Sequence, residues 1–245
     1  MNSLGLGALV VLLTVATAGA QSPLVAELDV VATRYHEDPK ALDAIRDALM
    51  RAAASDPRPE TLTGLARVSF IWGDVRATTE EQKLDAYDRG RQAAQRAVEL
   101  APRSASAHFW YATNTARWGQ TKGIVRSLFL LPEVQRGIDT VLELDPTFAA
   151  VYSLAGNVSY EVPGLLGGDL ARAEAMFRKG LELDPHFTGM RVGLAKTLIK
   201  VGRRAEAHRE LDAVLQDKAP SNPADWTVKD VPEARRVLAS LGGKS

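Results

Sequence analysis

The sequence predicts an all-α protein, an α-α superhelix of helical hairpins with a capping helix at its C-terminal end. Acid-proline or alanine-proline pairs recur along the chain, with prolines at 57, 102, 146, 185 and 220. Successive prolines lie 45, 44, 39 and 35 residues apart, and related sequences such as TVLELDP and KGLELDP precede them. Proline disfavours helical geometry in the residue before it, so each pair ends a helix. Helix-ending proline pairs at this spacing, with no strand-like alternation between them, are typical of a helical repeat array.

The chain divides into four expected parts: a signal peptide at 1–20, a divergent N-terminal hairpin at 21–58, the repeat array at 59–220, and a capping helix with a tail at 221–245. Ser22-Pro23 and Asp38-Pro39 are each expected to start a helix of the first hairpin. In the last part, Pro232 is expected to start the capping helix, whose charged face suits the end of an array.

The first twenty residues differ in composition from the rest. An apolar run from 4 to 16 is followed by Ala18-Gly19-Ala20, and no charged side chain occurs before Glu27. This pattern predicts a secretory signal cleaved after Ala20, and with it a periplasmic or secreted protein of a bacterial envelope. The alternative is an N-terminal membrane anchor, because the run approaches the lower length limit of a span. No later stretch is apolar enough to cross a membrane, so none is expected after signal removal.

Within the array, each unit is expected to hold two helices. Thr78-Thr79 and the following acidic residues offer a capping box for the second helix of the first unit. Pro132-Glu133 is expected to open the second helix of the next unit, since proline suits the first helical position. In the third unit Asp169 is placed to cap a helix, and Gly156 marks a close approach of two helices. Three of the units are expected to have stretched segments between their helices.

Two units carry the features of a tetratricopeptide repeat (TPR). The fourth unit resembles this family through its small residues, its turn glycine and its terminal proline: Ala195, Gly202, Ala207, Leu211 and Pro220. The third unit keeps the corresponding pattern: Tyr152, Gly156, Ala173, Phe177 and Pro185. The resemblance implies the α-α superhelix and a role in binding proteins.

Two stretches indicate a narrower relationship. HFWYATNTARWGQ at 108–120 and the sequence at 161–185 resemble the T-component (TatT-like) of tripartite ATP-independent periplasmic (TRAP) transporters. They are also similar to the helical region of the regulator-of-microtubule-dynamics proteins. The first resemblance implies a TRAP-type transporter or its periplasmic solute-binding protein as partner, and a homotrimer. The T-component is a lipoprotein, whereas this chain has no cysteine to carry a lipid.

Composition and motifs exclude several classes of function. Thirty basic and thirty acidic residues give a net charge of zero, whereas a nucleic-acid binder usually carries a basic excess. Without cysteine there is no disulfide, thiol nucleophile or Cys-type zinc site. The four histidines show no metal-ligand spacing, and no nucleophile motif such as G-x-S-x-G occurs. We therefore expect no enzyme activity, no catalytic residues, no cofactor and no bound metal.

The candidate binding surface is the concave face of the superhelix, which the first helix of each hairpin lines in the TPR family. By family position, the inward-facing side chains are Arg67, Phe70, Thr113, Arg117, Asn157, Tyr160, Glu161, Lys196 and Lys200. Most of these side chains are polar, and basic ones outnumber acidic ones, so the surface suits an extended acidic peptide. Two functions stay open: a protein-binding scaffold, or a binder of a small organic-acid-like molecule in a cavity enclosed by the repeats. The inserted segments could instead fill the groove or form a subunit interface.

Overall fold

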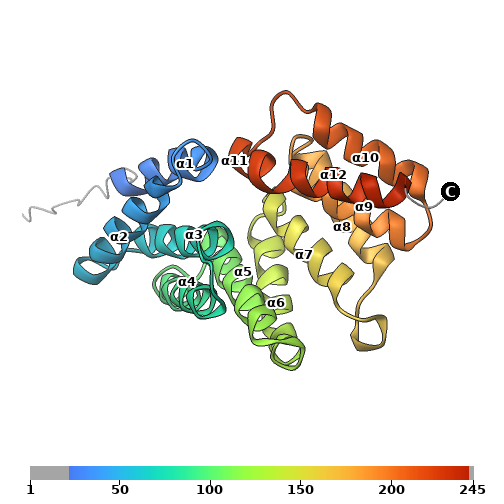
Figure 1. The fold of residues 1–245 in the computed structure, drawn as a ribbon. Helices are drawn as coiled ribbons and strands as arrows, with labels where there is room; N and C mark the ends of the chain where they lie inside the picture. Colours follow the sequence, from blue (N-terminus) through green and yellow to red (C-terminus); the bar gives the residue numbers. More distant parts are fainter. Residues whose placement is uncertain (1–21, 243–245) are drawn as a thin grey trace, which may run out of the picture.

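The computed structural model describes residues 22–242, and every regular element within them is helical. Five antiparallel hairpins follow one another along the chain (Figure 1). Their helices are α1 (Pro23–Arg34) and α2 (Lys40–Ser55), α3 (Pro59–Val75) and α4 (Glu80–Leu100), α5 (Ala105–Lys122) and α6 (Ile124–Leu144), α7 (Ala149–Glu161) and α8 (Leu170–Leu183), and α9 (Thr188–Lys200) and α10 (Arg204–Gln216). The predicted all-α superhelix of hairpins is confirmed.

The helix starts follow from local capping chemistry. The hydroxyl of Thr79 accepts a 3.2 Å hydrogen bond from the amide of Gln82, whose side chain accepts one from the amide of Thr79, so the expected capping box opens α4. Asp169 accepts from the amides of Ala171 and Arg172 and caps α8, as expected. Such caps satisfy amides that have no partner inside the helix.

The expected helix start at Pro132 is wrong, because Pro132 lies inside α6. The helix begins eight residues earlier, directly after Gly123, whose φ of +102° lets the chain reverse between α5 and α6 in one residue. The leucine-rich segment after Gly123 packs against α5 and buries Leu130. This packing holds the helix together although proline removes one hydrogen bond from its interior.

Close packing within a hairpin depends on glycine at the contact. A Cβ atom added to Gly156 in α7 would lie 2.6 Å from the ring of Phe177 in α8, which is fully buried. A Cβ atom added to Gly193 in α9 would lie 2.5 Å from the same ring. Phe177 therefore fills the space that three helices leave between them, and the expected close approach at Gly156 is present.

The hairpins fall into two length classes. The helices α3 to α6 have 17 to 21 residues, whereas α7 to α10 have 13 or 14. The stretched segments expected between the helices of the first two units of the array are therefore parts of longer helices, not loops. Only the third unit has a long connection, which contains the 3₁₀ turn η1 (Gly164–Leu166).

The C-terminal part folds back toward the start of the chain. It comprises α11 (Pro223–Asp225), a π-helical turn (Trp226–Asp230) and α12 (Val231–Gly242), which packs on α10 and α9 as a cap. We call residues 222–230 the C-terminal strap. Figure 1 shows α11 of the strap beside α1, so the segment that follows the fifth hairpin lies against the first helix of the described chain. No helix in residues 22–242 is long and apolar enough to span a bilayer.

Candidate functional site: the inner face and its strap

The nine candidate residues lie on the first helices of four successive hairpins, α3, α5, α7 and α9. The structure separates them into two groups. Those on α3 and α5 are engaged in packing and ion pairs inside the protein. Those on α7 and α9 lie around a small hollow beside the strap.

The first group holds helices together. Arg67 forms a 2.5 Å ion pair with Asp29 of α1. The ring of Phe70 packs against Trp110, with centroids 5.6 Å apart, and Thr113 is buried. These contacts join α3 to its neighbours and leave little of the three side chains for a partner.

Arg117 belongs to an ion network that anchors the strap. Asp74 of α3 pairs with Arg117 of α5 and accepts a 3.0 Å hydrogen bond from the ammonium of Lys229 in the strap. Lys229 also lies 2.9 Å from Asp225. The hydroxyl of Tyr35, at the end of α1, donates a 2.5 Å hydrogen bond to Asp225. One network thus connects the first three hairpins of the chain to its C-terminal segment.

The charges of this network reinforce one another. Burial alone would raise the pKa of Asp74, but the positive charges of Lys229 and Arg117 outweigh it and hold that pKa below its usual value. Burial would lower the pKa of Lys229, yet the carboxylates of Asp225 and Asp74 raise it. Asp74 and Lys229 are therefore both charged at neutral pH, and each compensates the buried charge of the other.

Asp230, the last residue of the strap, has a different environment. Burial raises its pKa to about 6, although a 2.7 Å hydrogen bond from the hydroxyl of Thr188 partly opposes the shift. Its carboxylate lies close to Gly189 on α9. Asp230 therefore titrates near neutral pH at the point where the strap meets the fifth hairpin.

The second group of candidates has more accessible side chains. The ammonium of Lys200 lies 3.6 Å from the centroid of the Tyr160 ring and donates to the Tyr160 carbonyl oxygen at 3.2 Å. Lys196 lies 3.3 Å from Glu233 of α12. Asn157 and Glu161 are exposed, and Glu161 accepts a 2.6 Å hydrogen bond from Gln120. These polar groups can offer hydrogen bonds to a bound molecule without the fold rearranging.

A hollow of about 160 Å³ lies between α7, α9 and the strap. Its lining combines four of the candidate residues with two glycines, a valine and a strap carboxylate: Asn157, Tyr160, Glu161, Gly189, Val192, Gly193, Lys196 and Asp230. Sequence reasoning missed the strap's part in this site. Asn222-Pro223 signals a helix start, and Asn222 does cap α11, but nothing local indicates where that helix lies.

No group of three or more His, Asp or Glu side chains in residues 22–242 is arranged to hold a metal ion. Asp74, Asp230 and Glu161 are instead paired with Lys, Arg, hydroxyl or amide donors.

The fold and the inner face define a TPR superhelix. A tetratricopeptide repeat profile matches residues 165–229. Among solved structures, the chain is similar to TTC0263, a TPR protein of Thermus thermophilus, with a TM-score of 0.63 and 20% identity over 89% of this chain and 98% of that one. It is also similar to PilF of Pseudomonas aeruginosa, with a TM-score of 0.52 and 17% identity, over 91% of this chain and 93% of that one.

The regulator of microtubule dynamics protein 1-3 profile matches residues 24–166, more than half of the chain, and the chain belongs to that family. Regulator of microtubule dynamics protein 3 of Rattus norvegicus is 25% identical over 197 residues, 71% of this chain and 42% of that protein. Regulator of microtubule dynamics protein 1 of Bos taurus is 26% identical over 181 residues, 67% of this chain and 56% of that protein. The chain thus spans about half the length of the curated relatives that it matches.

These relatives correct the expected location. They are mammalian proteins named as regulators of microtubule dynamics, so the prediction of a periplasmic or secreted protein of a bacterial envelope is wrong. The expected signal at 1–20 with cleavage after Ala20, and its alternative, an N-terminal membrane anchor, lie outside the described residues. The family shown is also not the TRAP T-component.

Proposed function

We propose that the chain is a non-catalytic scaffold that binds an extended acidic segment of a protein partner on the α7 and α9 part of its inner face. The single observation that carries the proposal is the grouping of Asn157 and Lys196 around one hollow beside the strap, with Lys200 against the Tyr160 ring of its wall. An asparagine amide can pair with a peptide backbone, and ammonium groups make charge-assisted hydrogen bonds with carboxylates. The remaining candidates on α3 and α5 support the shape of this surface.

The engagement of the inner-face carboxylates supports a non-enzymatic role. They are held in ion pairs or hydrogen bonds that serve the fold, as the pairing of Asp74 with Arg117 and Lys229 illustrates. No nucleophile with an adjacent base accompanies them among the described residues that line the hollow. Binding without chemistry is what this arrangement supports best.

The direct test uses a synthetic glutamate-rich peptide and fluorescence anisotropy at two salt concentrations. Binding should weaken as salt rises, and the double variant Lys196→Ala with Lys200→Ala should bind on the order of tenfold more weakly. Lys218→Ala removes an exposed lysine outside this group and is the control. Equal binding by parent and double variant would contradict the proposal.

The family name suggests microtubules as the first partner to examine. Cosedimentation of the full chain with microtubules assembled from purified tubulin, beside the same double variant and control, tests that partner. Loss of pelleting in the double variant alone would link the inner face to it.

A second candidate is the binding of a small organic acid in the hollow. The polar lining and the ammonium of Lys196 favour it. The volume of about 160 Å³ restricts the ligand to a size well below that of drug-like molecules, whose sites span roughly 300 to 1,000 Å³. Native mass spectrometry of the purified chain would show a co-purifying ligand of low mass. The TRAP-type partner and the trimer that the sequence resemblance implies stay predictions, and the mass of the assembly in solution tests the trimer.

A further inference from the structure

The C-terminal segment places two carboxylates against α9. Asp230, the last residue of the strap, accepts a 2.7 Å hydrogen bond from the hydroxyl of Thr188. A Cβ atom added to Gly189 would lie 3.5 Å from the same carboxylate, so Asp230 packs against the first turn of α9. Glu233, in the first turn of α12, lies 3.3 Å from the ammonium of Lys196, about two turns further along α9.

These carboxylates hold the contacts that an acidic partner would need. An acidic segment on the inner face requires the ammonium of Lys196 and the polar hollow beside it. Glu233 already pairs with Lys196, and Asp230 already lines the hollow. An incoming carboxylate therefore meets two like charges before it reaches Lys196, and like charges repel at such short range.

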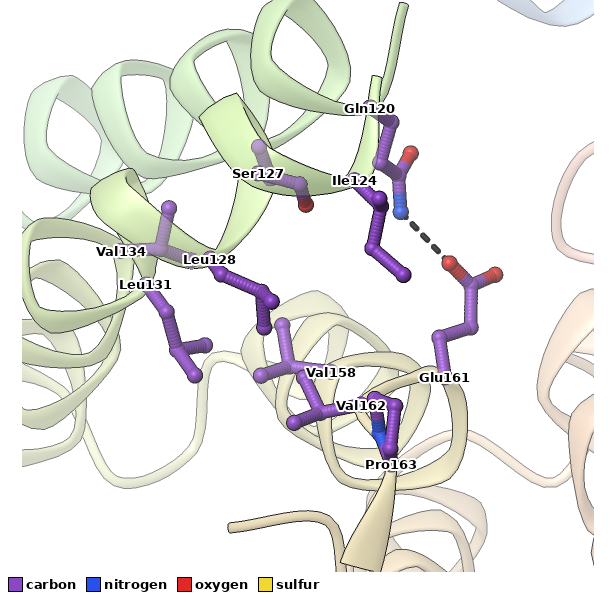
Figure 2. A pocket seen from close by; sticks show the side chains of 11 residues that line it. Gln120, Ile124, Ser127, Leu128, Leu131, Val134, Val158, Glu161, Val162 and Pro163 are labelled. Carbon is purple, nitrogen blue, oxygen red and sulfur yellow. Dashed lines mark hydrogen bonds between the residues drawn. The ribbon is translucent and has the colours of Figure 1, made fainter. Parts of the chain in front are cut away.

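A third carboxylate near the site, that of Glu161, is held by another hairpin. Glu161 lines both the polar hollow and a larger hollow of about 260 Å³ between α6 and α7. Figure 2 shows its carboxylate turned toward Gln120, from which it accepts a 2.6 Å hydrogen bond. Aliphatic side chains such as Leu128 and Val158 face each other across the larger hollow, and none of the described residues that line it is Lys or Arg. An acidic segment therefore finds its cation at the smaller hollow, where the competing carboxylates belong to the C-terminal segment.

Glu233 can release Lys196 without losing its other partner. Arg236, one turn further along α12, donates two hydrogen bonds of 2.7 Å to the Glu233 carboxylate. The ammonium of Lys196 lies farther from it, at 3.3 Å. Two parallel bonds from one guanidinium are the stronger arrangement. Release of Lys196 therefore breaks the longer contact and leaves the charge of Glu233 compensated.

The backbone that carries Asp230 is irregular. The turn Trp226–Asp230 is π-helical and connects the three-residue helix α11 to α12. Such turns are rare and occur frequently at functional sites. Contacts with distant parts of the chain hold the strap, among them the bonds of Lys229 with Asp74 and of Tyr35 with Asp225. Loss of these bonds would let the strap turn away from the hollow while α12 stays packed on α10.

We propose that the strap and the first turn of α12 are an internal competitor of the partner and form an autoinhibitory contact on the inner face. Asp230 and Glu233 occupy the positions of two partner carboxylates, and the acidic segment binds by displacing them. This inference rests on the function proposed above and adds its regulation. It also defines the segment further, because Asp230 and Glu233 are three residues apart, and side chains at this spacing lie on one face of a helix.

The test measures the affinity of the glutamate-rich peptide for the full chain by fluorescence anisotropy at low salt. Lys229→Ala removes a positive charge, so electrostatics alone predicts weaker binding of an acidic peptide. Release of a competing strap should instead raise the affinity about three- to tenfold, because a larger fraction of the protein is open to the peptide. If Lys229→Ala does not fold, Tyr35→Phe removes one hydrogen bond of the strap and should act in the same direction.

Glu233→Gln tests the competing carboxylate itself. The variant frees Lys196 and should also raise the affinity about three- to tenfold. Glu182→Gln is the matched control, because it removes the same charge from an exposed glutamate that pairs with Lys179 on α8. Its affinity should equal that of the parent. In a chain that also carries Lys196→Ala, Glu233→Gln should bring no gain, which a double-mutant cycle measures.

The outcomes separate this inference from the function on which it rests. Salt-dependent binding by the parent, with no gain in Lys229→Ala or Tyr35→Phe and none in Glu233→Gln, would overturn the autoinhibition and leave the proposed function standing. A gain from Glu233→Gln that persists without Lys196 would overturn it as well. Absence of peptide binding in the parent and in every variant would contradict both, whereas binding by the released variants alone would support both.

Discussion

The ammonium of Lys229 donates a 3.0 Å hydrogen bond to Asp74, a residue 155 positions earlier in the chain. Asp74 also pairs with Arg117, so one carboxylate on α3 is bound by side chains from α5 and from the strap. In a repeat array each hairpin ordinarily contacts only its neighbours. This contact instead links the second hairpin to a segment that follows the fifth.

Replacing Lys229 with alanine should release the strap and destabilise the protein. Asp74 and Asp225 would lose a shared cation in a partly buried place, and leaving charge uncompensated there costs about 1–3 kcal/mol in the free energy of unfolding. Urea denaturation measures this loss, and hydrogen exchange of residues 222–230 should accelerate. The exposed Lys218→Ala variant should leave both measurements at parental values.

The carboxyl group of Asp230 makes stability depend on pH in the direction opposite to most acids. Its folded-state pKa of about 6 lies above the ordinary aspartate value of 3.8, so the folded protein binds the proton more tightly than the unfolded chain. The stabilising contribution of protonated Asp230 to the free energy of unfolding is therefore fully present below about pH 4 and is lost as pH rises through about 6.

Asp230→Asn should remove this dependence while keeping an acceptor for the hydroxyl of Thr188. The variant should be more stable than the parent by about 1–3 kcal/mol at pH 8, and the difference should vanish near pH 4. Denaturation curves across this pH range measure the difference. A difference in the free energy of unfolding between variant and parent that is the same at all pH values would show that Asp230 does not titrate as described.

Gly156→Leu should be among the most damaging single changes. Even a Cβ atom at Gly156 would approach the Phe177 ring to 2.6 Å, so a leucine must displace a fully buried ring. Overpacking of this kind costs about 1–3 kcal/mol. Gly164→Ala is the control, because a Cβ atom there meets nothing within 4 Å. Thermal melting that is unchanged in Gly156→Leu would contradict the α7 and α8 contact.

Arg117 and Lys200 should respond differently to alanine although both are basic residues on first helices. Arg117→Ala removes a cation from the Asp74 network and should cost about 1–3 kcal/mol in the free energy of unfolding. Lys200 is exposed, so Lys200→Ala should change it by less than about 0.5 kcal/mol. Parallel urea denaturation of the two variants measures this contrast, and equal losses would argue against it.

The sequence predicts those parts of the fold that local chemistry controls. Thr79 and Asp169 cap their helices as expected, because a cap needs only residues within one turn. Gly156 could be assigned to a helix contact because glycine lowers the stability of a helix interior, so its presence there indicates a close approach of another helix. The expectation that Pro132 starts a helix was wrong, because the local preference of proline for the first helical turn is outweighed by the packing of the leucines before it.

The site was less predictable because it depends on contacts between distant parts of the chain. Family position placed Arg117 and Lys196 on the inner face but could not show that Asp74 and Glu233 pair with them. Tyr35 and Asp225 are 190 positions apart, and no pattern in either segment indicates the other. The position of the strap therefore had to come from the structure.

The strap converts an open helical array into a closed loop of contacts. An open array can widen or narrow by small rotations between neighbouring hairpins, and it can unravel from either end. Here a change in curvature must stretch the bonds of Tyr35 with Asp225 and of Lys229 with Asp74. A ligand that needs a wider inner face must therefore offset the free energy of breaking these hydrogen bonds. A ligand that fits the present width binds a surface that is already in the required shape. Closure of the ends thus sets the aperture of the protein.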